Sequence, residues 1–400
     1  MGLFLRKKCE KIMKNLAVRK KKHYNVSVFP KNGIHLRRDF RKDAFDRLLE
    51  ERYRMNNMKK RMMALLLSGV LAVSMFAGCG SKLDKTATVA TLGETQVSLG
   101  VANFAARLQQ AQYDDFYTMY FGQNAWKTDM YGTGTTLEDD LKSGVLQSLN
   151  AMYAMKANMA DYGVEITAED VTAISAAAGS FISSNSAEAV EALGAEREYV
   201  EAYLELLTIQ ARMYDEIVKD ANTNVTEAEA NTSSYSYVRV SRTNYTDEEG
   251  KSVEHTEETL ATLAADMKAF MTAVEADGFD AAAKAKEYNV YEGTFNSKST
   301  DIDEKVLTAL ADLEEGEVSE LIETASQYYV VRLDAKTDRD ATEANRQNII
   351  TERQNALYTE VVEEMMKELT WTVNEKVWEQ VSFKNLFTIV EKTTELSTEE

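Results

Sequence analysis

The chain of 400 residues is poor in the residue types that most often carry chemistry: it has one proline, two cysteines and three histidines. From Cys79 onward the sequence has no proline, no further cysteine and a single histidine, His255. These absences exclude a disulfide framework and a cysteine-histidine metal site in that part of the chain. A Ser-His-Asp triad would have to use His255, which lies in an acidic, polar run at 244–258 that we expect to be a solvated loop. Because glycine-rich phosphate-binding motifs are also missing, we expect no metal and no cofactor.

Basic residues are scarce after the same point: residues 79–400 hold 26 basic and 59 acidic side chains, a net charge of −33. Such an acidic surface repels phosphate backbones, so we expect no nucleic acid partner. Residues 1–57 have the opposite balance, with 17 basic and 6 acidic side chains and a net charge of +11. This extension has the charge to bind nucleic acid or an anionic membrane. We favour the alternative that 1–57 is a mis-called start and that translation begins at Met58, because signal peptides normally stand at the N-terminus.

The segment 58–78 has the composition of a secretory signal peptide. Three basic residues at 59–61 precede an apolar run at 62–75, and small residues follow directly before Cys79. The run is too short and too weakly flanked for a confident spanning helix. Its Ala-Gly-Cys end resembles a bacterial lipobox, with Phe76 where leucine is usual, and this resemblance implies cleavage before Cys79 and a lipid attached to its sulfur. The alternatives are an ordinary signal peptide with an incidental cysteine, or a short membrane anchor.

The pattern after the anchor changes twice along the chain. Strand signals at 88–98 and a series of capped helices to 233 give way to alternating strand residues from 234, and a long helix returns at 342–369. This order predicts one helical lobe in two pieces with an α+β module inserted between them. The predicted segments are a tether at 79–87, the first helical piece at 88–233, the module at 234–335, the closing piece at 336–392 and a disordered tail at 393–400.

Several motifs in this order resemble the PrsA/SurA foldases, which are extracytoplasmic chaperones with a parvulin-type prolyl isomerase domain. In the helical lobe they are YGVEITAED at 162–170 and VTEAE at 225–229. In the module they are DGFD at 277–280, LADLEEGEVS at 310–319 and QYYVVRL at 327–333. The resemblance implies a mostly helical α+β chain, with a discontinuous SurA-N/trigger-factor-like chaperone lobe and an inserted parvulin-like domain.

The sequence departs from the parvulin pattern at the positions that matter for catalysis. Tyr237 stands where active parvulins carry histidine in the first strand, and Tyr329 stands at the second histidine position in the closing strand. Glu292 is the best match for the acidic position. A phenol lacks the tautomers and near-neutral pKa of imidazole, so the resemblance implies a degenerate isomerase domain in which both tyrosines are scaffold residues. The alternative is an active isomerase that uses Tyr237 and Tyr329.

The leading functional hypothesis is therefore a lipid-anchored chaperone on the outer face of the bacterial cytoplasmic membrane. Its expected partners are unfolded or newly exported polypeptides and the membrane; a homodimer stays open. Aromatic and methionine side chains adapt to varied clients, and the candidates for client binding in the helical lobe are Tyr113, Phe116, Tyr117, Tyr120, Met152 and Met155. Each of these also fits the core of a helical lobe. A solute-binding lipoprotein is a third hypothesis, which would require two lobes of alternating strands and helices.

Overall fold

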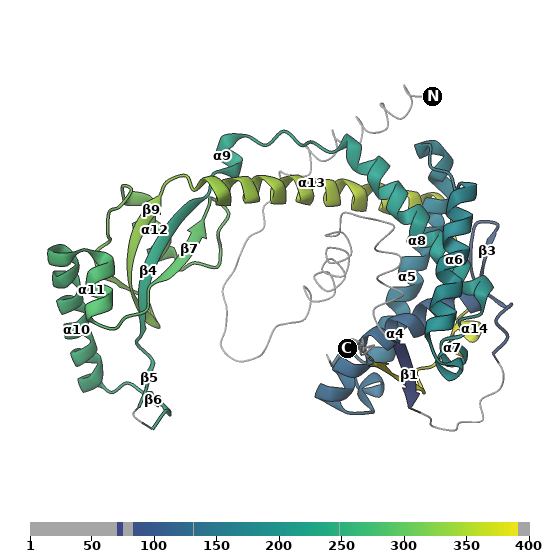
Figure 1. Ribbon diagram of the computed structural model, residues 1–400, viewed down its shortest axis with the longest axis horizontal. Coiled ribbons are helices and arrows are strands. Elements are labelled where there is room, and N and C mark those ends of the chain that lie inside the picture. Colours follow the sequence, from purple (N-terminus) through teal and green to yellow (C-terminus); the bar gives the residue numbers. More distant parts are fainter. Residues whose placement is uncertain (1–69, 75–82, 131, 248, 391–400) are drawn as a thin grey trace, which may run out of the picture. The chain divides into compact units, whose positions relative to one another are not determined.

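The computed structural model describes residues 70–74, 83–130, 132–247 and 249–390 (Figure 1). The predictions for 1–57, the remainder of the signal peptide, Cys79 and 393–400 lie outside the described residues. The described residues divide into two compact units: a helical unit, formed by those up to Asp220 and from Leu357 onward, and an inserted unit, Ala221–Ala356. The insertion follows the predicted order, but the inserted unit is larger than 234–335. The reason is a small core of Val225, Ala230 and Ile349, which joins the flanking segments to it.

The helical unit contains a three-stranded antiparallel sheet in the order β10-β2-β3. β2 (Thr88–Leu92) and β3 (Thr95–Ser98) form a hairpin around Gly93, whose φ of 57° suits a tight turn that favours glycine. β10 (Trp371–Val373) pairs with β2 from the far end of the chain. The two pieces of the unit are thus joined by backbone hydrogen bonds.

Five helices form most of this unit: α4 (Leu99–Phe121), α5 (Leu137–Asn158), α6 (Ala168–Ser184), α7 (Ala187–Leu193) and α8 (Arg197–Ile217). Short 3-10 turns follow α4, α5 and α8 at Ala125–Lys127, Met159–Tyr162 and Val218–Asp220. Ser98 caps α4, and capping boxes at Thr136 and Thr167 begin α5 and α6, in the region where capped helices were predicted. Phe104 forms edge contacts with Phe181 and Tyr203 at 5.7 and 5.8 Å between ring centroids, which places the core between α4, α6 and α8.

A two-stranded antiparallel sheet joins β1 (Val70–Ser74) to β11 (Leu386–Val390). β1 lies inside the segment predicted to be a signal peptide, where no strand was expected. Among the described residues, no helix combines the length and apolarity needed to cross a bilayer. The segment after α13 packs back on the fold. Its buried side chains are Trp378 in α14 (Glu375–Trp378), Val381, Phe383 and Phe387.

The inserted unit is built on a four-stranded antiparallel sheet in the order β7-β4-β9-β8. Its strands are β4 (Ser233–Ser241), β7 (Tyr291–Phe295), β8 (Ile322–Glu323) and β9 (Gln327–Ala335). α10 (Glu257–Asp277) and α11 (Phe279–Ala285) cover one face, with Val238 and Val330 between them and the sheet (Figure 1). α12 (Glu304–Asp312) packs on the other face against Val331 and Leu333. The alternation of side chains along β4 and β9 accounts for the two separate cores.

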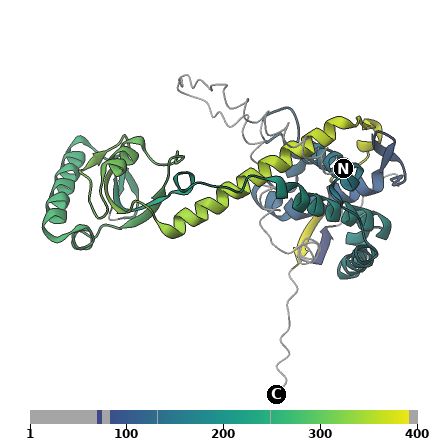
Figure 2. The same cartoon turned by 90° about the horizontal axis from the view of Figure 1, so that it is seen from above.

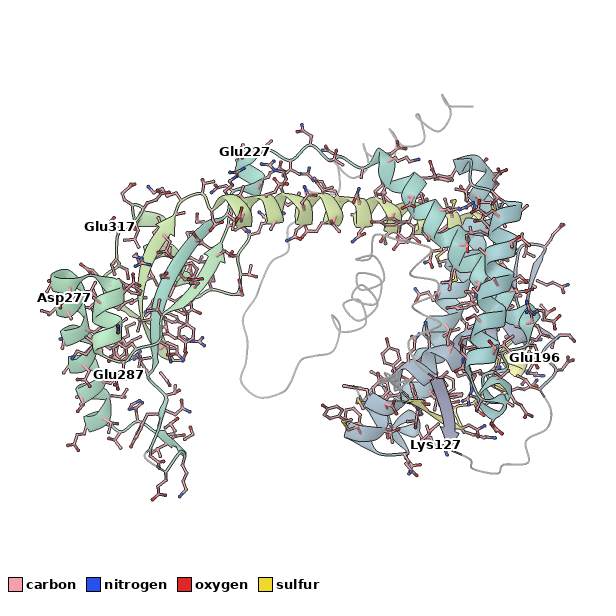
Figure 3. The ribbon with its side chains drawn as sticks, viewed as in Figure 1. Lys127, Glu196, Glu227, Asp277, Glu287 and Glu317 are labelled. Atoms are coloured by element: carbon pink, nitrogen blue, oxygen red, sulfur yellow. The ribbon has the colours of Figure 1, made fainter. Side chains whose placement is uncertain are left out.

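One segment of the inserted unit differs from the expected solvated loop. The run at 244–258 contains a hairpin of β5 (Asn244–Thr246) and β6 (Ser252–Glu254), because Asp247 accepts backbone hydrogen bonds from Glu249 and Lys251 in its turn. α11 begins directly after Gly278. It ends before Glu287, whose φ is 58°; Figure 3 labels this residue and Asp277.

α13 (Arg339–Glu368) is one unbroken helix, as Figure 2 also shows, and its residues are shared between the two units. In the inserted unit, α13 is bonded to the segment around α9 (Glu227–Ala230): Arg346 donates to the carbonyl oxygen of Val225 at 2.6 Å, and Arg353 pairs with Glu229 at 2.5 Å. The paired strands in the described residues are all antiparallel, so the fold lacks the two α/β lobes that a solute-binding protein would require.

Candidate functional site

The positions predicted to replace the parvulin histidines lie on one face of the inserted sheet. Tyr237 is on β4 and Tyr329 is on the adjacent β9, with their ring centroids 6.1 Å apart. β4 pairs with β7 on its other side, which brings Tyr291 opposite Tyr237 with stacked rings at 5.3 Å. The structure therefore brings the two predicted site residues together.

Two further rings complete a tyrosine face, defined as Tyr235, Tyr237, Tyr291, Phe295 and Tyr329. Tyr235 stacks on Tyr237 at 5.4 Å and meets Phe295 edge-on at 5.8 Å. Tyr235 is buried, Tyr237, Phe295 and Tyr329 are half-buried, and Tyr291 is exposed. The face thus has a buried base and an accessible rim.

The buried phenol of this face, Tyr235, has a raised pKa. Burial, with a smaller contribution from the nearby acidic groups of Tyr237, Asp301 and Tyr329, raises the pKa of Tyr235 to about 12. Glu292 does not join the face: it is the residue after Tyr291 on β7 and is exposed on the opposite side of the sheet. Glu292, the best match for the acidic position, therefore does not lie beside Tyr237 and Tyr329.

An apolar, aromatic face of this kind can bind a proline ring by stacking, and its hydroxyl groups can form hydrogen bonds with a peptide. Its five residues provide no imidazole and no carboxylate. Prolyl isomerisation breaks no bond and has a barrier of about 20 kcal/mol, which an enzyme lowers by favouring the twisted amide over the planar one. Phenols are the polar groups that the face offers for this purpose.

A second candidate surface lies at the C-terminal end of α4 in the helical unit. We call it the α4 aromatic ladder: Tyr113, Phe116, Tyr117, Tyr120 and Phe121. Phe116, Tyr120 and Phe121 are 54%, 65% and 47% exposed, and the adjacent Met119 is 76% exposed. Ring centroids lie 4.8 Å apart for Phe116 and Tyr120, and 5.1 Å apart for Tyr117 and the buried Trp126. The ladder is thus fixed to the core at Trp126 and reaches solvent beyond it.

The two methionines predicted to contact clients do not lie on this surface. Met152 and Met155 are 1% and 0% exposed on α5. The hydroxyl group of Tyr358 lies 3.3 Å from Sδ of Met155, inside the core of the helical unit. The prediction for these two residues is corrected: they fall on the α5 stripe that faces α4 and α8, so they are core residues.

Sequence reasoning missed a charged network buried beneath the ladder. Asp114, 0% exposed, accepts hydrogen bonds from the indole N–H of Trp126 at 2.5 Å, from the backbone N–H of Phe387 at 2.7 Å, and from Gln110 at 3.1 Å. Burial raises the pKa of Asp114, whereas these hydrogen bonds and the charge of Arg107 oppose the rise.

Arg107 is the cationic member of the network, and burial lowers its pKa to about 10. It donates to the carbonyl oxygens of Ser382 and Asn385 at 3.1 Å each, and its guanidinium lies 4.8 Å from the ring centroid of Phe387. The network therefore fastens the C-terminal segment to α4. One signal in the sequence could have predicted this network: Arg107, Gln110 and Asp114 follow each other at spacings of three and four within an apolar helical stripe.

Comparison with known proteins gives one family match. Residues 241–345 match the family described as PPIC-type PPIase domain. The match begins at the last residue of β4, so Tyr329 lies within it and Tyr237 lies just before it. The predicted parvulin-like domain is thereby confirmed, while the departures at both tyrosines stand. No curated protein sequence matches the chain.

Similar solved structures include the foldase protein PrsA from Lactococcus lactis, with 17% identity and a TM-score of 0.30 over 74% of this chain and 100% of that one. PrsA from Streptococcus pneumoniae has 19% identity and a TM-score of 0.29 over 59% of this chain and 88% of that one. A structure from Campylobacter jejuni, described among SurA-like chaperones, has 8% identity and a TM-score of 0.24 over 72% and 98% of the two chains.

Proposed function

We propose that this chain is an extracytoplasmic chaperone of the foldase type that binds unfolded or newly exported polypeptides. The observation that carries the proposal is the α4 aromatic ladder, with Phe116, Tyr120 and the adjacent Met119 each more than half exposed. Contiguous apolar side chains on a surface mark sites of interaction, and aromatic and methionine groups adapt to clients of varied sequence. The net charge of −33 after Cys79 would keep a loaded complex in solution and favour basic client segments.

The proposal includes a lipid anchor at Cys79, supported by the signal-like composition of 58–78 and its Ala-Gly-Cys end. Two acyl chains, each contributing about 0.8 kcal/mol per buried CH₂, would hold the protein at the outer face of the cytoplasmic membrane. Mass spectrometry of protein from a bacterial host tests it. A mass that corresponds to the chain from Cys79 plus diacylglyceryl is expected, and Cys79→Ser should abolish the lipid. A chain that retains 58–78 would contradict this part of the proposal.

The ladder is tested by suppression of aggregation of an unfolded protein. Replacing Phe116 and Tyr120 together by serine removes two exposed rings. The concentration of this protein needed to halve the aggregation should then rise about tenfold. Val171→Ser is the matched control, because Val171 is a 57% exposed apolar residue on α6, away from the ladder. Equal suppression by the double variant and the control would contradict the assignment of the ladder as the client surface.

The PPIC-type domain is proposed to serve as a scaffold without isomerase activity, because both histidine positions carry tyrosine. An active isomerase is the second candidate, favoured by the half-buried Tyr237 and Tyr329 beside the exposed Tyr291. Cis/trans exchange of a proline peptide, followed by NMR, separates the two. No added exchange is expected. Catalysed exchange that is lost in both Tyr237→Phe and Tyr329→Phe would establish the isomerase and assign its action to the hydroxyl groups.

A further inference from the structure

The pairing of β1 with β11 joins two parts of the chain that the predicted processing would separate. Val70 pairs with Val390 and Ser74 with Leu386, so all five residues of β1 take part. β1 lies upstream of Cys79, inside the segment that a signal peptidase would remove. After that cleavage, the processed chain keeps β11 and loses its partner strand.

β11 is held in place by contacts that do not involve β1. The backbone N–H of Phe387 donates to Asp114 at 2.7 Å, and Gln110 donates to the carbonyl oxygen of Asn385 at 2.9 Å. The side chain of Phe387 is 1% exposed and packs against Arg107. These bonds use the edge of β11 that faces α4, so the outer edge stays formed when β1 leaves.

The place taken by β1 has the features of a peptide-binding edge. The backbone N–H of Leu71 donates to Oδ1 of Asn185, at the end of α6, at 2.9 Å, and the side chain of Leu71 is 6% exposed. When β1 is removed, the backbone N–H and C=O groups on the outer edge of β11 lose their partners. Oδ1 of Asn185 loses the N–H of Leu71, and the apolar site that the Leu71 side chain fills becomes empty. An edge strand with unpaired backbone groups is a template for strand addition.

We propose that the outer edge of β11 in the processed chain binds an extended, uncharged aliphatic segment of an unfolded polypeptide by antiparallel strand addition. The sequence of β1, VLAVS, shows which chemistry the edge accepts: small and branched aliphatic side chains without charge. Main-chain hydrogen bonds supply affinity that tolerates sequence change, which suits a chaperone. The inference rests on the proposed function and on cleavage before Cys79, and it gives β1 the role of blocking the edge in the unprocessed chain.

The first test compares two forms of the protein, both carrying Cys79→Ser so that neither is lipidated. One begins at Met58 and retains β1; the other begins at residue 79. The probe is a fluorescent peptide of residues 69–75 with lysines added for solubility, and the readout is fluorescence anisotropy. The peptide is expected to bind the shorter form. Its affinity for the longer form should be lower by about tenfold or more, because β1 in the same chain competes for the edge. A peptide with proline in place of Ala72 is the control and should not bind, since Ala72 pairs with Thr388.

The second test uses a matched pair of substitutions in β11. Phe387 directs its N–H to Asp114, so strand alternation directs the N–H of the next residue, Thr388, to the outer edge. The side chain of Thr388 is exposed. Thr388→Pro removes this donor and should weaken binding about fivefold to tenfold, whereas Thr388→Ala keeps it and should bind like the parent. Asn185→Ala removes the acceptor for the peptide residue that takes the place of Leu71, and it should also weaken binding. This variant tests the edge if the proline substitution disturbs the fold.

The outcomes separate this inference from the proposed function. Peptide binding that is lost in Thr388→Pro and retained in Thr388→Ala confirms the edge. A processed chain that suppresses aggregation but does not bind the peptide overturns the edge and leaves the chaperone proposal intact. A concentration-dependent dimer that excludes the peptide and dissociates in Thr388→Pro also overturns it, because a second copy would then occupy the edge. Failure of both assays overturns both proposals.

Discussion

At the scale of single residues, the buried Asp114 holds Trp126 and the C-terminal segment against α4 in the helical unit. Asp114→Ala would leave the indole N–H of Trp126 and the backbone N–H of Phe387 without their acceptor. It would also remove one of the two carboxylates, Asp114 and Glu138, whose charges act on Arg107. Breaking a buried charged network in this way costs about 3–5 kcal/mol. Urea unfolding followed by tryptophan fluorescence measures it. Asp115→Ala changes the exposed neighbour and should cost less than about 1 kcal/mol; an equal loss in both variants would contradict the role of the network.

Tyr235 makes the stability of the inserted unit depend on pH in the alkaline range. Its pKa rises from 10.0 to about 12 in the folded chain, chiefly because of burial. Between these values the folded state retains a proton that the unfolded state loses, so stability from this group is complete below pH 10 and falls as pH rises toward 12. Tyr235→Phe should remove this part of the slope. Urea midpoints of both proteins from pH 8 upward test the prediction, which fails if the two curves stay parallel.

The sheet face on which a residue lies could be predicted from the sequence where the residue follows the alternating pattern of a strand. Tyr237 and Tyr329 share a face because both follow the alternation of a strand, and the sequence contains that alternation. Met152 and Met155 could not be separated from surface residues, because burial on α5 depends on where α4 and α8 pack. Asp114 was missed for a related reason: its donors Trp126 and Phe387 are brought to it only by the folded chain.

At the scale of elements, the contact between β4 and β7 depends on a glycine. A Cβ added to Gly293 would lie 2.7 Å from ring atoms of Tyr235, which is buried and cannot move aside freely. Gly293→Ala should therefore destabilise the inserted unit by about 1–3 kcal/mol. Gly144→Ala is the control, because Gly144 lies within α5 with open space around it. This substitution should raise the free energy of unfolding by about 0.5–1 kcal/mol. Thermal unfolding of the two variants gives both values, and stabilisation by Gly293→Ala would contradict the packing.

Elements with local signals were predicted well, and those with distant partners were not. The capping boxes at Thr136, Thr167 and Thr226 are each contained within four residues, so the helix starts could be read directly. β1 and β10 are short strands whose partners lie at the opposite end of the chain. A run such as VLAVS satisfies the pattern of a signal peptide and that of a strand, and only the pairing with β11 distinguishes them.

At the scale of the whole molecule, the inserted order could be predicted but its limits could not. The motifs indicated a helical lobe interrupted by an α+β module, and the chain does divide into a discontinuous and a continuous unit. The limits moved outward because Arg346 and Arg353 bind backbone carbonyl groups in 222–225 from the first half of α13. Such contacts between segments more than a hundred residues apart leave no local pattern in the sequence.

The division into two units predicts two unfolding transitions. All three tryptophans, Trp126, Trp371 and Trp378, belong to the helical unit, so their fluorescence follows that unit alone, while far-ultraviolet circular dichroism follows both. The two signals should not coincide in urea. Asp114→Ala should move the fluorescence transition, whereas Gly293→Ala should leave it in place and move only the remaining dichroism change. If either variant shifts one coincident transition seen by both probes, the unbroken helix α13 couples the units into a single cooperative fold.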